Sequence, residues 1–295
     1  MHKINEICKD GKSLPLSTEG NLRVVFLGVG SAFTKRNRQS NFLIIQEDHH
    51  VLVDCGTLGS LALDDVGLSV SEVQCYLPTH SHADHIGGFE EVALVNRYLS
   101  NSSNKPKMVI PKDYQDLLWT KSLAGGLEFC EVSQGQPLEL TDFFEILCPR
   151  QMELLGKKVW SYKHGPMELI LMRSLHIPDS AISIDDAQWC TGVLVNRRVW
   201  ISGDTMFDKE YPNQFSRVSE VMFHDCQMFQ GGVHASYHEL MTLPNEIRSK
   251  IYLYHYNDNW DKPKTWVKDS DDFIGDPIKD GFLGWTEQQV AYDFE

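Results

Sequence analysis

Thr79-His80-Ser81-His82-Ala83-Asp84-His85 is the stretch of this 295-residue sequence that decides its fold. The apolar run before it, Val73–Leu77, is short and ends at a proline, which is typical of a strand. Four side chains that can bind a metal therefore lie within six residues, in the turn beyond a strand: His80, His82, Asp84 and His85. Histidine nitrogens and an aspartate oxygen suit zinc, iron or manganese. We expect a metal-binding loop here rather than a solvated histidine-rich turn.

Three further segments repeat this design, in which a predicted strand ends at a residue that can bind a metal. Leu169–Leu175 ends at His176, Val199–Ser202 runs into Gly203-Asp204-Thr205, and Ile251–Tyr254 ends at His255. Loops at strand ends are where rigid scaffolds present functional groups. Either histidine alone would more often be structural, but together with the first cluster these residues fill the coordination needs of two ions.

The rest of the chain forms two strand-rich halves, each with helices. Further strands are expected at Leu22–Leu27, Asn41–Ile45, Val51–Val53, Lys107–Ile110, Thr191–Val195 and Val221–Phe223. Helices are expected over Gly87–Leu99, near Tyr114–Leu118, and between His238 and Ile247, where Pro244 would end or kink the helix. The pattern suggests an α/β protein with a sandwich of two sheets flanked by helices.

The composition bounds the class of protein and its compartment. Forty-one acidic against 27 basic residues give a net charge of −14, which disfavours a long nucleic-acid substrate, because phosphate contacts come from Lys and Arg. The seven cysteines include no CxxC and fit free thiols in a reducing compartment. The sequence contains neither a signal-peptide core nor an apolar run of membrane-spanning length, so we expect a cytoplasmic protein.

His80-Ser81-His82-Ala83-Asp84-His85 matches the HxHxDH signature of the metallo-β-lactamase fold superfamily, and Val51–Gly56 looks like the strand and Asp motif that precede it. The resemblance covers the chain from about Arg23 to Trp260. It implies a four-layer αββα sandwich in a single domain over residues 21–295. The first 20 residues are polar and contain Gly, Pro and Ser, so we expect them to form a loose lead-in. The resemblance also implies that Asp54 steadies the metal-binding loop of residues 79–85, here called the ligand loop. A role as an ordinary turn residue is an equal alternative for Asp54.

The resemblance implies a specific ligand set for two divalent ions, with zinc expected first and manganese or iron as alternatives. His80, His82 and His176 would hold one ion, and Asp84, His85 and His255 the other, with Asp204 bridging both. Two cations stabilise hydroxide near neutral pH, and Asp84 can also orient it, so water attacks without a covalent intermediate. Ser202 and Ser236 are then not needed as nucleophiles.

Other motifs narrow the branch of the superfamily. Phe26–Ala32, followed by Arg36-Asn37, is similar to the opening of ribonuclease Z proteins and their relatives, which include cyclic-nucleotide phosphodiesterases. Phe223-His224-Asp225, His234-Ala235-Ser236 and Leu253-Tyr254-His255-Tyr256 resemble later motifs of that group.

The resemblance implies that His234 protonates the leaving oxygen or stabilises the phosphoryl oxygens, and that Asp225 holds its tautomer. Asp225 stands where the group has Glu, and a purely structural role is the alternative for both residues. His164, His224 and His238 receive no predicted role.

The leading hypothesis is hydrolysis of a small phosphodiester such as a cyclic nucleotide. The segment from Lys112 to Tyr162 could hold a tRNA-gripping arm, but it lacks a dense run of basic residues. Three alternatives stay open: a ribonuclease Z-like tRNA 3′ endonuclease, a lactone or thioester hydrolase of the same fold, and a non-catalytic metal- or oxygen-sensing module.

Members of this branch are often homodimers, so a homodimer is one option for the assembly. Aromatic residues near the C-terminus could serve such an interface, although residues of this kind more often pack against their own core: Trp260, Trp266, Phe273, Phe282 and Trp285.

Overall fold

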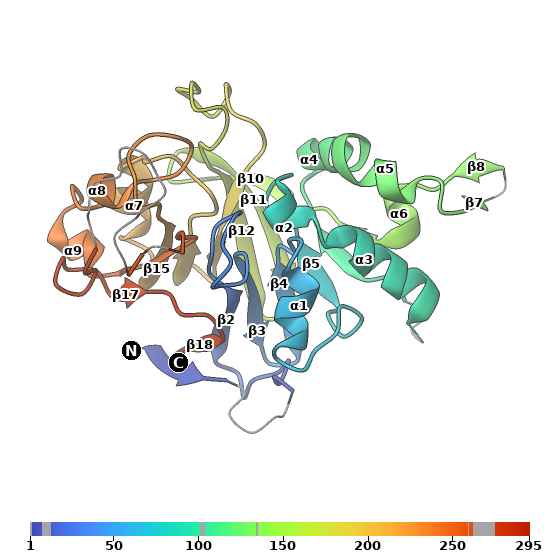
Figure 1. Ribbon diagram of the computed structural model, residues 1–295, viewed down its shortest axis with the longest axis horizontal. Helices are drawn as coiled ribbons and strands as arrows, with labels where there is room; N and C mark the ends of the chain where they lie inside the picture. The colour runs from blue at the N-terminus through green and yellow to red at the C-terminus, as the bar shows by residue number, and fades with distance from the viewer. Residues whose placement is uncertain (1, 8–12, 101–103, 134, 259, 262–274) are drawn as a thin grey trace.

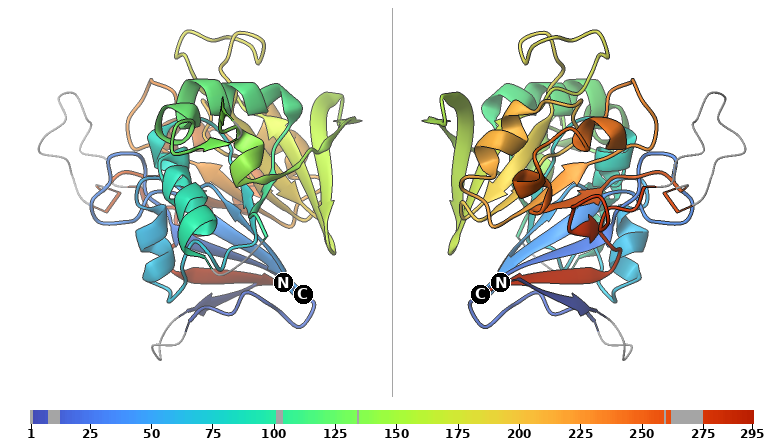
Figure 2. Two further views of the ribbon diagram at one scale, coloured as in Figure 1. Left: turned by 90° about the vertical axis from the view of Figure 1, so that its right-hand side faces the viewer. Right: turned by 90° about the vertical axis from the view of Figure 1, so that its left-hand side faces the viewer.

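Two eight-stranded sheets lie face to face in this computed structural model, with helices on the outer side of each (Figures 1 and 2). The structure describes residues 2–7, 13–100, 104–133, 135–258, 260–261 and 275–295. Trp266 and Phe273 belong to the segment outside these ranges. The expected four-layer αββα sandwich is confirmed.

The first sheet has the strand order β1-β18-β2-β3-β4-β5-β6-β9. Its strands are β1 (His2–Glu6), β18 (Val290–Phe294), β2 (Leu22–Gly28), β3 (Asn41–Gln46), β4 (His49–Val53), β5 (Cys75–Leu77), β6 (Lys107–Val109) and β9 (Glu145–Leu147). The second sheet has the order β10 to β17 along the chain. Its strands are β10 (Arg150–Leu154), β11 (Lys157–His164), β12 (Met167–Arg173), β13 (Thr191–Val195), β14 (Val199–Ile201), β15 (Val221–Asp225), β16 (Ile251–Tyr254) and β17 (Gly284–Trp285).

Helices cover both outer faces, and a short hairpin extends from one end (Figure 1). The helices beside the first sheet and in the extension are α1 (Gly59–Asp64), α2 (Ala83–Ile86), α3 (Phe89–Leu94), the π-helical turn η1 (Val95–Leu99), α4 (Lys112–Leu118), the π-helical turn η2 (Trp119–Leu123), α5 (Ala124–Leu127) and α6 (Leu140–Phe143). The hairpin strands are β7 (Val132–Ser133) and β8 (Gln136–Pro137), and the helices beside the second sheet are α7 (Glu210–Phe215), α8 (Tyr237–Leu240) and α9 (Asn245–Arg248).

The alternating direction of side chains along each strand explains why the molecule has more than one core layer. In β2, Val24 and Phe26 belong to the cluster between the sheets, whereas Val25 and Leu27 pack with the helices of the first half. Successive strand residues point to opposite faces, so a strand with apolar residues throughout is buried on both sides. Phe26 reaches across the sandwich to Phe223, with ring centroids 4.8 Å apart.

Both sheets change from antiparallel to parallel pairing along their strand order. β4, β5 and β6 pair in parallel in the first sheet, and β14, β15 and β16 do so in the second. The carboxyl ends of parallel strands lie at one edge of a sheet, so the residues that follow these strands gather there. This topology brings together the His and Asp residues that can bind a metal.

The predicted strands all form, with bounds that move by one or two residues, and Pro244 separates α8 from α9 as expected. Within the lead-in over residues 1–20, His2–Glu6 forms β1 and pairs antiparallel with β18. Backbone hydrogen bonds to an edge strand do not require apolar side chains, so the polar composition of this segment did not reveal the pairing.

Other described features bear on the class of protein. No helix in the described ranges is long and apolar enough to span a bilayer. The six cysteines within those ranges are free: Cys55, Cys75, Cys130, Cys148, Cys190 and Cys226. Three of the C-terminal aromatic residues, Trp260, Phe282 and Trp285, pack against the protein's own core.

His49, His50 and His164 form a histidine cluster where the β3–β4 hairpin meets the β11–β12 hairpin. His164 is its member from the second sheet. The ring of His164 packs edge-on against His49, with centroids 5.4 Å apart. Burial, followed by the charges of His49 and Lys107, lowers the pKa of His164 to about 4. In the unfolded chain a histidine has a pKa of about 6.5. The unfolded state therefore binds more protons between these two values, and acid favours unfolding there.

We predict that stability falls as the pH drops from 6.5 to 4, and that His164→Gln loses part of this fall. The expected contribution is on the order of 2 kcal/mol, after allowance for the partial solvent exposure of the ring. Chemical denaturation of both proteins at pH 7 and pH 5 measures it. An unchanged pH dependence in His164→Gln would contradict this account of the cluster.

Candidate active site

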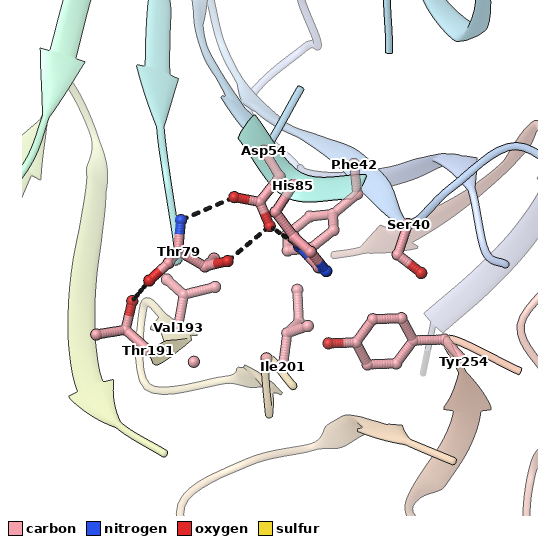
Figure 3. A pocket seen from close by; sticks show the side chains of 11 residues that line it. Ser40, Phe42, Asp54, Thr79, His85, Thr191, Val193, Ile201 and Tyr254 are labelled. Atoms are coloured by element: carbon pink, nitrogen blue, oxygen red, sulfur yellow. Dashed lines mark hydrogen bonds and ion pairs between the residues drawn. The ribbon is translucent and has the colours of Figure 1, made fainter. Parts of the chain in front are cut away.

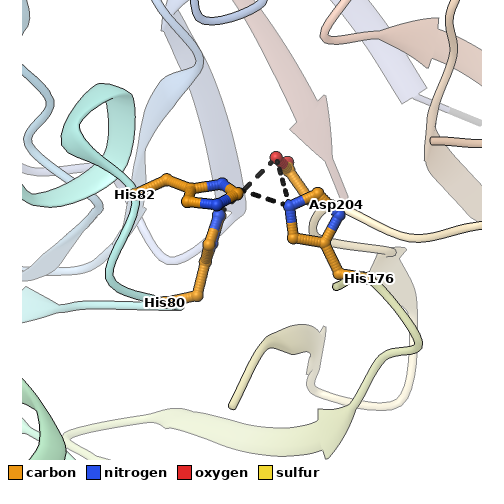
Figure 4. Close-up of side chains that lie close together, drawn as sticks. All are labelled: His80, His82, His176 and Asp204. Atoms are coloured by element: carbon orange, nitrogen blue, oxygen red, sulfur yellow. Dashed lines mark hydrogen bonds and ion pairs between the residues drawn. The ribbon is translucent and has the colours of Figure 1, made fainter. Parts of the chain in front are cut away.

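Every residue predicted to bind metal lies at the sheet edges described above. His80 and His82 follow β5, Asp84 and His85 lie in α2, and His176 follows β12. Asp204 follows β14 and His255 follows β16. They form two groups that share Asp204, and the ligand atoms within each group all lie within 4.8 Å of one another: His80, His82, His176 and Asp204 in the first, and Asp84, His85, Asp204 and His255 in the second. Figure 4 shows the first group converging from opposite sides.

Asp204 lies between the two groups. Its Oδ2 atom is 3.8 Å from the Nε2 atoms of His80 and His176, and 3.2 Å and 3.4 Å from those of His85 and His255. One carboxylate oxygen thus faces ligand nitrogens from both groups. This is the position expected for a bridging ligand.

The donor atoms at the centre of the site fit divalent metal ions. The Nε2 atoms of His80, His85 and His255 and both carboxylate oxygens of Asp204 are buried without a hydrogen-bond partner. Buried polar atoms are nearly always paired, because an unpaired one costs about 1–3 kcal/mol. Several such atoms directed at one another are explained when a cation receives their lone pairs.

The electrostatics of the site favour the metal-binding forms of His176 and Asp204 and the protonated form of His255. Burial lowers the pKa of His176 to about 4, so its ring is neutral at neutral pH. Burial opposes the charge on Asp204, but His255 and His85 outweigh it and hold the pKa of this carboxyl well below its usual range. For His255, burial is outweighed by Asp204 and Asp225, which raise its pKa to about 10. A metal ion that binds at this position would therefore displace a proton from His255.

Hydrogen bonds behind the ligands fix which nitrogen of each ring faces the centre. His85 Nδ1 donates to Asp54 Oδ2 at 2.7 Å, and His176 Nδ1 donates to the carbonyl oxygen of Val233 at 2.9 Å. Both leave Nε2 with its lone pair for a metal. The Val233 contact was not predicted, because a backbone acceptor leaves no mark in the side-chain pattern.

Asp54 holds both ends of the ligand loop, as expected for a residue that steadies it (Figure 3). Its two oxygens accept hydrogen bonds from the backbone N–H of Thr79 at 2.7 Å and from the Thr79 hydroxyl at 2.8 Å, and Oδ2 also accepts from His85. Asp54 has a φ of 61°, a conformation that is uncommon outside glycine. The backbone is therefore held in an unusual conformation where it aims this carboxylate.

His234 and Asp225 form a pair beside the two metal groups. His234 Nδ1 donates to Asp225 Oδ2 at 2.8 Å, and the backbone N–H of Thr205 donates to the same oxygen at 2.9 Å. The side chain of His234 is 21% exposed, whereas that of Asp225 is fully buried. The His234 ring lies 4.9 Å from that of His176 and 4.8 Å from that of His255. An accessible imidazole thus borders the centre, and a buried carboxylate orients it.

Other residues near the centre have structural contacts. The Ser202 hydroxyl accepts a hydrogen bond from the Asp225 backbone N–H and donates to the Gly203 carbonyl, and Ser236 caps α8. His224 Nδ1 donates to the Asp225 carbonyl oxygen. These contacts agree with the expectation that neither serine acts as a nucleophile.

Comparison with known proteins gives a consistent result. A family model described as Anti-Pycsar protein Apyc1 matches residues 22–281. A protein of that name from Bacillus phage 010DV004 is 34% identical over 243 residues, which is 81% of this chain and 90% of the relative. One from Paenibacillus xerothermodurans is 30% identical over 278 residues, covering 93% of this chain and 98% of the relative.

Solved structures are similar in fold. The metallo-β-lactamase fold protein YhfI from Bacillus subtilis has a TM-score of 0.63 at 15% identity, covering 93% of this chain and 100% of that one. The short form of human tRNase Z has a TM-score of 0.57 at 16% identity, covering 80% of this chain and 93% of that one. These likenesses confirm the metallo-β-lactamase fold.

Proposed function

The chain belongs to the family of anti-Pycsar proteins described as Apyc1, and from this premise we propose that it is a metal-dependent phosphodiesterase that hydrolyses a cyclic nucleotide. The observation that carries the proposal is the pair of buried His/Asp groups that share Asp204, with the Asp225–His234 pair beside them. A biological role in removing a cyclic-nucleotide signal would follow from this activity and from the name of the relatives.

Seven side chains would hold two divalent ions, with zinc expected first and manganese or iron as alternatives. They are His80, His82 and His176 for one ion, Asp84, His85 and His255 for the other, and Asp204 between them. Two bound ions would polarise the phosphoryl group and lower the pKa of water.

Asp84 is the carboxylate placed to orient the attacking water. Burial raises the pKa of Asp84, but the neighbouring His85 and His255 more than offset this effect, so the net shift is downward and the side chain is ionised. Its Oδ2 atom lies 3.3 Å from His85 Nε2 and 3.5 Å from His255 Nε2. An ionised carboxylate at that position can accept a hydrogen bond from water.

His234 is the group placed to protonate the leaving oxygen. Burial opposes ionisation of Asp225, but His234 outweighs it, and the pKa of the Asp225 carboxyl is lowered. The ionised carboxylate accepts a hydrogen bond from the Nδ1–H of His234. The Nε2 atom is then the ring nitrogen that can exchange a proton with the substrate. Asp225 therefore orients the His234 ring.

The charge of the extension that begins with α4 supports a small substrate. The extension over residues 112–143, seen at one end in Figure 1, carries six acidic and two basic residues. They are Asp113, Asp116, Glu128, Glu131, Glu139 and Asp142 against Lys112 and Lys121. Binding of tRNA needs many Lys or Arg contacts to phosphates, and this extension does not offer them. A cyclic nucleotide carries one phosphate and needs no extended basic surface.

A substrate panel tests the proposal. Metal-loaded protein is incubated with 2′,3′- and 3′,5′-cyclic nucleotides, bis-p-nitrophenyl phosphate, a 3′-extended pre-tRNA and a lactone. We expect turnover of a cyclic nucleotide that stops when a chelator removes the metal. Cleavage of the pre-tRNA alone would identify a tRNA 3′ endonuclease instead. Turnover of the lactone without any phosphodiester would identify a carboxyl-ester type of hydrolase, and turnover of none would favour a metal-sensing module.

A further inference from the structure

Ser81, which lies between the candidate ligands His80 and His82, contacts a tyrosine from a different part of the fold. The Tyr114 hydroxyl lies 2.9 Å from Ser81 Oγ. Tyr114 comes from α4 and is fully buried. Asp54 holds the two ends of the ligand loop through Thr79 and His85, and Tyr114 contacts its middle.

Tyr114 is itself held by an aromatic neighbour from the second half of the chain. Its ring stacks on Trp189, with centroids 5.6 Å apart and an angle of 6° between the planes. Trp189 also packs edge-on against Trp160, with centroids 5.0 Å apart. Offset stacks and edge-on contacts of this kind fix ring orientation. The Tyr114 hydroxyl is therefore presented from a rigid ring.

The segment of residues 176–189 begins with the candidate ligand His176 and ends with Trp189. Arg173 lies just before this segment and contacts its far end. The Arg173 guanidinium lies 4.9 Å from the centroid of the Trp189 ring. Its Nη2 atom donates to the carbonyl oxygens of Ala187 at 3.0 Å and Gln188 at 2.9 Å. Arg173 ends β12, three residues before His176. The segment that carries His176 is thereby tied to the stack.

We propose that Tyr114, supported by Trp189 and Arg173, is a positioning residue for the first metal group. His80 and His82 come from the first sheet and His176 from the second, so their mutual geometry depends on how the two sheets are joined. The contacts from Arg173 through Trp189 and Tyr114 to Ser81 join the two segments directly. Ligands held in place before the ion arrives bind it more tightly, and partners behind the ligands change metal affinity by about 10–100-fold. The inference rests on the proposed metal site.

The test compares zinc affinity in two tyrosine-to-phenylalanine variants, measured by competition with a chromogenic chelator. Tyr114→Phe keeps the stacked ring and loses only the hydroxyl, and we expect about 10-fold weaker zinc binding. Tyr76→Phe is the matched control, because Tyr76 is also fully buried and its hydroxyl donates to the Val70 carbonyl oxygen at 2.6 Å, away from the ligand loop. We expect it to lower the melting temperature by a similar amount and to leave zinc affinity unchanged.

Ser81→Ala supplies a second, independent variant. If the hydroxyl contact carries the effect, Ser81→Ala weakens zinc binding as Tyr114→Phe does, and the double variant is no weaker than either single one. Wild-type zinc affinity in both single variants would overturn the role of Tyr114, and so would equal losses in Tyr114→Phe and Tyr76→Phe. A wild-type protein that binds no zinc, manganese or iron would instead overturn the metal site and the proposed function with it.

Discussion

Asp204→Ala is expected to reduce bound metal from two ions per chain to one or none, and to reduce turnover by at least about 10³-fold. Asp204 is the residue shared by both groups, and its Oδ2 atom faces ligand nitrogens of each. Its removal leaves three ligands in each group and takes away the negative charge that offsets two adjacent cations. His82→Ala is expected to lose the ion of the first group for the simpler reason that one ligand is gone.

Elemental analysis of purified protein measures this directly, beside the turnover of the best cyclic nucleotide. Asp48→Ala is a suitable control, since its side chain is 84% exposed and lies outside both groups. It should retain both ions and full turnover. If Asp204→Ala and His82→Ala each retained two ions per chain, the ligand assignment would be wrong.

His234→Ala is expected to retain both ions and lose turnover by about 10²–10⁴-fold, the usual contribution of a proton-transferring group. The loss should depend on the leaving group. A nucleoside alkoxide must be protonated as it departs, whereas p-nitrophenolate departs as a stable anion. The defect should therefore be much smaller with bis-p-nitrophenyl phosphate than with a cyclic nucleotide.

The control for this variant is His238→Ala, which changes a histidine of α8 outside the metal groups and should keep wild-type turnover. Unchanged turnover in His234→Ala would make His234 a structural loop residue. Loss of metal from His234→Ala would make it a ligand instead, because His234 also lies within 4.8 Å of donor atoms from Asp204, Asp225 and His255. An equal defect with both leaving groups would argue against proton transfer.

The sequence predicted which His and Asp residues lie close together, because topology does most of the assembly. Asp204 and His255 follow β14 and β16, in the parallel part of the second sheet. His176 follows β12, which pairs antiparallel with both of its neighbours but runs in the same direction as β14. Once strands are recognised and paired in parallel, the residues after them must meet at one edge. The hydrophobic pattern and the ends of strands can be recognised in a sequence, so this part of the site could be predicted.

The supporting contacts were less accessible, because they depend on packing between distant segments. Tyr114 lies in a stretch with little pattern of its own, and its contact with Ser81 depends on how α4 packs over the ligand loop. The Val233 carbonyl that orients His176 belongs to a loop whose course no side chain reveals. The pairing of His2–Glu6 with β18 joins the two ends of the chain through backbone atoms and one side-chain hydrogen bond, from Asn5 Nδ2 to Asp293 Oδ2 at 2.7 Å. Periodicity contains no information on contacts of these kinds.

The central claim is tested most directly by following 2′,3′- and 3′,5′-cyclic nucleotides with phosphorus NMR in three samples of the same protein. The first is loaded with zinc, the second is stripped by a chelator, and the third is stripped and then reloaded. The account predicts that a linear nucleoside monophosphate forms in the first and third samples and not in the second. Absence of product from the loaded protein, or equal product from the stripped protein, would contradict it.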